Sequence, residues 1–226
     1  MITKIIKILK IMLTINYTGL LILLLFSLFL SPLLEGLFFG IIIDILFILT
    51  LALSIGVFHS KNKTGIIYFG LIFLSIALKS KLVLPLFGNE QNLVTIVSTL
   101  VTAYFLGFAI YLLGKSIVQC KRVTSDTVMG GICIYLLIGV FFSVFYKAIY
   151  QINSNAFIIS SQEYGSTFDP LYFSFVTLCT VGYGEIIPIA PLAKVLTNLE
   201  AVSGVLYPAT AIARLMSLYV AQQLKD

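Results

Sequence analysis

Long runs without a charged side chain dominate this sequence. Residues 11–34, 91–114 and 127–146 contain no Asp, Glu, Lys or Arg, and residues 36–58 contain only Asp44. A helix needs about 20 mostly apolar residues to cross a bilayer core of about 30 Å. Each run is long enough for one such crossing, so the pattern predicts a chain whose main solvent is lipid.

Two further stretches complete the set. Residues 64–78 carry no charge, and residues 195–222 carry only Glu200 and Arg214. The sequence therefore predicts an all-α membrane protein with six transmembrane helices. The composition agrees, because 60% of the residues are hydrophobic and 10% are charged, whereas about 25% are charged in a typical soluble domain. This excludes an ordinary cytosolic enzyme.

The basic residues predict the orientation. With the N-terminus inside, nine of the 14 Lys and Arg residues fall in inner segments and four in outer ones. Because cytoplasmic loops are enriched in Lys and Arg, we expect both termini to be cytoplasmic. The net charge of +5 thus reflects orientation in a cell membrane (plasma or inner membrane). The lipid bilayer is the expected partner, and no nucleic acid is expected.

The stretch 150–190 is too long for a tight turn between the fifth and sixth crossings. Asp169 followed by Pro170 predicts a helix start, with a capping oxygen and a residue that needs no amide proton. The next ten residues suit a short buried helix but are too few to cross. The chain must therefore enter the membrane and return, which irregular backbone tolerates only when buried in protein or lining a water-filled path.

The segment after this short helix reads Thr180-Val181-Gly182-Tyr183-Gly184. Gly182 and Gly184 can adopt φ > 0 without steric cost, as alternating backbone angles require. Four such strands would stack rings of carbonyl oxygens, with the Thr180 hydroxyl as the lowest ring, and these rings would replace the hydration shell of K⁺. We therefore expect K⁺ at Thr180, Val181, Gly182 and Tyr183. One chain supplies one such loop, so the ring requires a homotetramer.

These residues resemble the selectivity filter of the tetrameric pore-loop potassium-channel superfamily, and the resemblance covers about residues 128–222. It implies an outer helix, a pore helix, a filter and an inner helix. The expected domains are a four-helix sensor-like transmembrane domain at 1–114, a cytoplasmic connector at 115–127 and a pore domain at 128–226. Gly204 lies where the family has a gating-hinge glycine, and Pro208 adds a kink. Close packing of Gly204 against the pore helix is an equal alternative.

The chain departs from the family pattern at three places. Cys179 and Glu185 stand where Thr and Asp are usual, and Tyr172-Phe173 replaces an aromatic pair that is often Trp-Trp. We expect Tyr172 to donate a hydrogen bond to Glu185 and so to brace the filter. The residues assigned to filter support are Tyr172, Thr177, Cys179 and Glu185.

The fourth apolar run contains no Arg or Lys between residues 91 and 114. Voltage sensing needs several charges that cross the membrane field, each contributing about 2.3 kcal/mol per 100 mV. Strong voltage gating is therefore rejected. Glu200 and Asp44 are acids inside predicted crossings, and each is interpreted as either a proton site or a packing site.

The sequence thus predicts a potassium-selective channel that conducts K⁺ passively, is not strongly voltage-gated and needs no cofactor. It is not expected to be an enzyme, because the sequence shows no Ser/His/Asp set, metal-ligand cluster or phosphate-binding loop and has one His. Two alternatives stay open: a non-selective cation channel, and a non-conducting regulatory or scaffold subunit.

Overall fold

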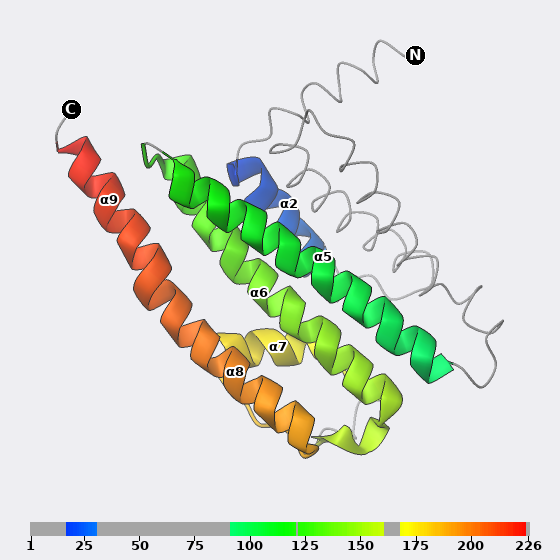
Figure 1. The fold of residues 1–226 in the computed structure, drawn as a ribbon. Helices are drawn as coiled ribbons and strands as arrows, with labels where there is room; N and C mark the ends of the chain where they lie inside the picture. Colours follow the sequence, from blue (N-terminus) through cyan, green and yellow to red (C-terminus); the bar gives the residue numbers. More distant parts are fainter. Residues whose placement is uncertain (1–16, 31–90, 121, 161–167, 225–226) are drawn as a thin grey trace, which may run out of the picture. The chain divides into compact units, whose positions relative to one another are not determined.

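The computed structural model describes residues 17–30, 91–120, 122–160 and 168–224, and all structural statements below concern these residues. The helices and strands carry the labels of Figure 1. In chain order they are α2 (Tyr17–Leu30), α5 (Gln91–Gln119), α6 (Ser125–Ile152), η2 (Ser154–Ala156), β1 (Phe157–Ile159), α7 (Pro170–Leu178), β2 (Ile186–Pro188), α8 (Pro191–Tyr207), η3 (Pro208–Ile212) and α9 (Ala213–Gln223).

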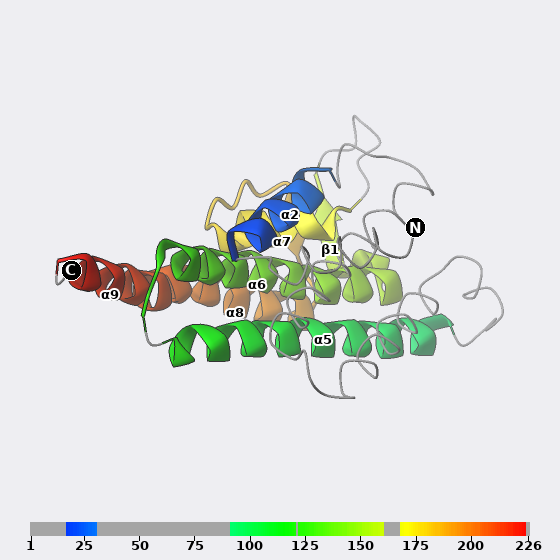
Figure 2. The same cartoon turned by 90° about the horizontal axis from the view of Figure 1, so that it is seen from above.

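Three described helical segments are long and apolar enough to cross a membrane: Ile96–Gln119, Ser125–Ile152 and Pro191–Gln223. They correspond to the predicted fourth, fifth and sixth crossings. In the last of them α8, η3 and α9 follow one another without a break (Figure 2). α2 covers part of the first predicted crossing. The second and third predicted crossings, with Asp44, lie outside the described residues.

Helices occupy most of the predicted connector at 115–127. α5 continues to Gln119, and α6 begins at Ser125. The start of α6 is capped by Thr124, whose Oγ1 accepts from the backbone N–H of Thr127 at 3.3 Å. Since caps rather than charges decide where a helix begins and ends, Lys115 and its polar neighbours do not stop α5.

The chain forms two compact units. The described part of the first unit comprises α2, the end of α5, the start of α6 and most of α9. Here Asp126 of α6 accepts hydrogen bonds from the backbone N–H groups of Tyr17 at 3.1 Å and Thr18 at 2.9 Å. A carboxylate stabilises the first turn of a helix in this way, so Asp126 caps α2 from a different helix.

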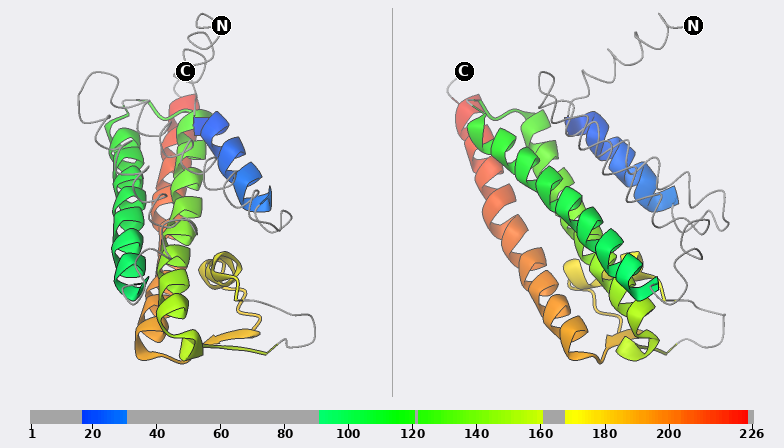
Figure 3. Two further views of the ribbon diagram at one scale, coloured as in Figure 1. Left: turned by 90° about the vertical axis from the view of Figure 1, so that its right-hand side faces the viewer. Right: turned by 45° about the vertical axis from the view of Figure 1, so that its right-hand side comes forward.

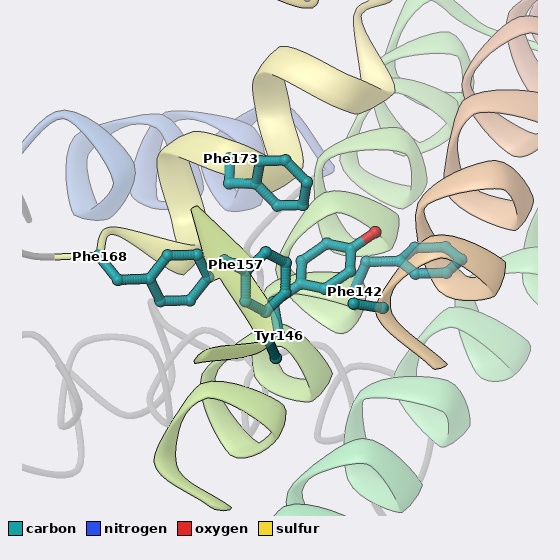
Figure 4. Packing of buried hydrophobic residues seen from close by; sticks show 7 residues of the cluster. Phe142, Tyr146, Phe157, Phe168 and Phe173 are labelled. Atoms are coloured by element: carbon teal, nitrogen blue, oxygen red, sulfur yellow. The ribbon is translucent and has the colours of Figure 1, made fainter. Parts of the chain in front are cut away.

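The second unit contains most of α5, α6 from Tyr135, α7, α8, η3 and both strands. Its aromatic core joins the end of α6 to the start of α7 (Figure 4). Tyr146 contacts Phe173 edge-on, with ring centroids 4.9 Å apart, and Phe157 stacks on Phe168 at 4.6 Å. Such pairs add to the stability that burial already provides. The core therefore fixes where α7 begins.

A short β-sheet is one feature that the all-α prediction missed. β1 and β2 pair antiparallel, with Ile158 opposite Ile187, and Figure 3 shows them near the end of α6 and the beginning of α8. The backbone N–H of Ser160 extends the ladder by donating to the carbonyl oxygen of Glu185 at 2.8 Å. Strands of three residues give almost no alternation pattern in sequence. The pairing closes the loop that carries α7.

Candidate functional site

The site begins with α7, whose first turn has the predicted cap. Asp169 accepts from the backbone N–H groups of Leu171 at 2.9 Å and Tyr172 at 3.1 Å, and Pro170 is the first helical residue. The helix ends at Leu178 after nine residues. The predicted short helix is therefore confirmed. It packs against α8 and α6 (Figure 1).

The segment after α7 folds back on the last turn of that helix. The backbone N–H of Thr180 donates to the carbonyl oxygen of Thr177 at 2.9 Å, and that of Val181 donates to the carbonyl oxygen of Val176 at 2.9 Å. Gly182 N–H lies 3.3 Å from the same Val176 oxygen. These bonds satisfy carbonyls that a helix end leaves without partners. They hold the start of the segment against the last turn of α7.

Every second residue of this segment has a left-handed backbone. Gly182 has φ 57° and Gly184 has φ 84°, as predicted, and Thr180 has φ 58°. Glycine adopts this region freely, but for a β-branched residue it is a genuine outlier. Thr180 is the only non-glycine residue with positive φ in the described part of the chain. Strain of this kind persists where surrounding structure enforces it, and it clusters at functional sites.

The expected hydrogen bond from Tyr172 to Glu185 is present. Tyr172 Oη donates to Glu185 Oε1. A phenol is protonated at neutral pH, so Tyr172 can donate to Glu185 there. It joins the first turn of α7 to the far end of the Thr180–Gly184 segment.

Two large side chains of this segment are exposed, Val181 to 50% and Tyr183 to 70%. A cavity of about 370 Å³ is lined by residues of the segment together with Thr177 of α7 and Thr197 and Ala201 of α8. Large apolar side chains that point away from their own chain indicate a contact surface for another molecule.

Below the segment, Cys179 is exposed and forms the C-cap of α7. Its sulfur lies 3.8 Å from the hydroxyl of Tyr135 on α6. That hydroxyl also donates to the carbonyl oxygen of Leu178 at 3.2 Å, and its ring stacks on Tyr207 with centroids 6.2 Å apart. Tyr135 thus connects the end of α7 to two longer helices.

Gly204 makes the closest helix contact of the site. A Cβ built on Gly204 would clash with the carbonyl oxygen of Leu178 and lie 2.9 Å from its carbonyl carbon. The packing alternative for Gly204 therefore has direct structural support. Pro208 begins a π-helical turn that continues to Ile212. Such a turn accommodates the hydrogen bond that proline cannot make, and it marks a local change in the helix.

Glu200 is fully buried where α6, α7 and α8 meet. Its Oε2 accepts from Tyr146 Oη at 2.6 Å, and its Oε1 is hydrogen-bonded to Ser174 Oγ. Asp44, the other predicted intramembrane acid, is outside the described residues. Within the described ranges no group of three or more His, Cys, Asp or Glu side chains is arranged to hold a metal ion.

Sequence reasoning missed Tyr135, Tyr146 and Ser174. Tyr146 and Ser174 are 54 and 26 positions from Glu200, and Tyr135 is 44 positions from Cys179, so no spacing pattern connects these partners. The strained Thr180 had a weak signal, because it lies two residues before Gly182 and four before Gly184 in an alternating segment.

Comparison with known proteins places the whole site inside one family match. Residues 131–221 match a family described as ion channel. The inward rectifier potassium channel Kirbac3.1 of Paramagnetospirillum magnetotacticum is 40% identical over 78 residues, which are 34% of this chain and 24% of that protein. Two-pore potassium channel 5 of Arabidopsis thaliana is 39% identical over 62 residues, 27% of this chain and 13% of that protein.

The matches thus span a quarter or less of the length of these curated relatives. No solved structure matches the chain significantly.

Proposed function

We propose that this chain is a subunit of a potassium-selective channel, because residues 131–221 match a family described as ion channel and two potassium channels are 40% and 39% identical to parts of it. The chain conducts K⁺ passively across a cell membrane. Thr180, Val181, Gly182, Tyr183 and Gly184 form the filter, and α6, α7 and α8 with α9 are its outer, pore and inner helices. The domain limits at 1–114, 115–127 and 128–226 are part of the same proposal.

One observation carries this proposal: the left-handed backbone at Thr180, Gly182 and Gly184. When every second residue is left-handed and those between are not, successive carbonyl groups can point to the same side of the chain. Carbonyl oxygens so aligned can replace the water around a K⁺ ion. A simple glycine-rich turn would not need the strained Thr180.

Four copies are required because one chain contributes one strand of carbonyls. The exposed Val181 and Tyr183 support this arrangement, since another subunit would cover them. Tyr172 and Glu185 brace the filter from outside, while Thr177 and Cys179 support its inner end. The four chains lie in the bilayer with both termini cytoplasmic.

The proposed gating is not strongly voltage-dependent. Within Gln91–Gln119 the only charged residue is Lys115, and a voltage sensor needs several charges per subunit. Gly204 and Pro208 on the inner helix are the proposed places where the pore changes shape. Glu200 and Asp44 are the proposed proton or packing sites.

Ion flux from liposomes tests the proposal. Purified chain should pass K⁺ and Rb⁺ but not Na⁺, and Ba²⁺ should block the flux. Equal Na⁺ and K⁺ flux would indicate a non-selective cation channel instead. No flux of either ion would indicate a regulatory or scaffold subunit.

Gly182→Ala is the most specific test of the filter. Its new Cβ meets nothing within 4 Å, but the residue has φ 57°, which a side chain disfavours. The change therefore acts through backbone strain, about 1–2 kcal/mol for one left-handed residue, and K⁺ flux should disappear. Gly114→Ala is the matched control, as it also meets nothing within 4 Å but lies in α5. Unchanged K⁺ selectivity in Gly182→Ala would refute the filter assignment.

A further inference from the structure

Around buried Glu200, the number of close oxygen–oxygen contacts exceeds the number of hydroxyl protons that could bridge them. Tyr146 Oη lies 2.6 Å from Glu200 Oε2, Ser174 Oγ is hydrogen-bonded to Glu200 Oε1, and Ser174 Oγ lies 2.6 Å from the carbonyl oxygen of Gly139. Each of these three contacts needs one proton between its two oxygens. The phenol of Tyr146 and the hydroxyl of Ser174 carry one proton each.

The missing third proton has one available source. An ionised Glu200 would leave one contact as two facing oxygens without a proton, and such a buried contact is strongly unfavourable. A protonated carboxyl group supplies the proton. No buried side-chain nitrogen or oxygen in the described residues lacks a hydrogen-bond partner, so the cluster is complete as built.

Among the described residues, none places a counter-charge at Glu200. The ionisable groups near it are phenols of α6, Tyr146 and Tyr135. α7 contributes the hydroxyl of Ser174, and its sequence PLYFSFVTL contains no Asp, Glu, Lys, Arg or His. No Lys or Arg hydrogen-bonds to Glu200 within the described residues. A fully buried carboxylate without a cation is costly, and neutralisation is the usual outcome.

The geometry points to Glu200 as a neutral carboxylic acid that positions the pore helix. Tyr146 donates to Glu200 Oε2, protonated Oε1 donates to Ser174 Oγ, and Ser174 donates to the Gly139 carbonyl oxygen. This chain of hydrogen bonds ties α8 to α7 and to α6. Ser174 lies six residues before Thr180. These hydrogen bonds therefore fix α7, the helix that holds the start of the proposed filter segment.

Infrared difference spectroscopy of the reconstituted full-length chain tests the proton directly. Wild type minus Glu200→Gln at neutral pH should show the carbonyl stretch of a protonated carboxylic acid. Glu185→Gln, which also removes one carboxyl group, should leave that band in place. A difference spectrum that shows an ionised carboxylate at Glu200 would overturn the inference, and this readout does not depend on conduction.

Flux measurements test the positioning role, which rests on the proposed function. Gln can replace the neutral acid, because its amide N–H donates to Ser174 and its oxygen accepts from Tyr146. Glu200→Gln should therefore keep K⁺ flux within about twofold of wild type. Glu200→Leu removes both carboxyl oxygens that Tyr146 and Ser174 contact, which costs about 1 kcal/mol or more and corresponds to at least about fivefold lower flux.

The outcomes separate the two hypotheses. Equal losses of flux in Glu200→Gln and Glu200→Leu would overturn the positioning role. If wild-type chain passes no K⁺ at all, the proposed function fails, while the infrared band still decides the protonation of Glu200. A thermal unfolding midpoint lowered in Glu200→Leu but not in Glu200→Gln would then support the hydrogen-bond chain by itself.

Discussion

At the scale of single residues, the site depends on a few side chains that hold a strained backbone. Tyr172 reaches from the first turn of α7 to Glu185, beyond the Thr180–Gly184 segment. A tyrosine makes this hydrogen bond in a sequence that contains no Trp. Because Glu185 is only half-buried, water competes for its carboxylate. The brace is therefore expected to be weaker than a fully buried one.

Tyr172→Phe tests this brace. Removing the hydroxyl leaves Glu185 without its donor and should cost about 1 kcal/mol in the stability of the folded site. We expect K⁺ flux to decay faster with time, with little change in the K⁺ over Na⁺ preference, since the carbonyl rings are untouched. Time-resolved flux from liposomes measures both quantities.

Tyr219→Phe is the matched control for that variant. Tyr219 lies on α9, and its hydroxyl makes no hydrogen bond with the described residues. It should behave as wild type. Identical decay in Tyr172→Phe and Tyr219→Phe would show that the hydroxyl of Tyr172 does not stabilise the filter.

At the scale of elements, the contact between α8 and the end of α7 sets the position of α7. Gly204 allows the backbone of α8 to approach the carbonyl group of Leu178, and Glu200 one turn earlier is hydrogen-bonded to Ser174 of α7. In a lipid environment, small residues permit this kind of close helix approach. This contact holds α8 against α7 near Gly204, and bending is more easily accommodated at the π-helical turn that begins at Pro208.

Gly204→Ala should break this contact. The new methyl group meets backbone atoms, which cannot rotate away, so a loss of about 1–3 kcal/mol is expected. Thermal unfolding in detergent measures it. Gly114→Ala has open space in α5 and should be neutral or stabilising by up to about 1 kcal/mol, because Ala favours a helix over Gly. Equal stability of the two variants would argue against the close approach.

At the scale of the whole molecule, the proposed tetramer gives some of the exposed apolar residues a partner. α8 exposes Leu192, Val195, Leu199, Val202 and Leu206, each at least 55% exposed. Their spacing of three and four residues forms one stripe along the helix. Together with exposed Val181 and Tyr183, this stripe suits contact with other subunits around a shared pore.

Linked subunits test whether four chains share one filter. In a tandem of four covalently joined copies, one Gly182→Ala copy should abolish most K⁺ flux, because every carbonyl ring then contains a defective member. If each chain conducted independently, the flux would fall by only about a quarter. Native mass spectrometry of the unlinked chain should give a tetramer.

The sequence by itself determined the apolar runs, the capped start of α7 at Asp169 and the glycines that take positive φ, because each depends on local composition or on one residue's own conformational range. It also suggested the bond from Tyr172 to Glu185. Only the tertiary structure decided that Gly204 packs on Leu178, that β1 pairs with β2, and that Glu200 meets Tyr146 and Ser174. Those contacts join residues tens of positions apart, and no local pattern encodes which buried groups will meet.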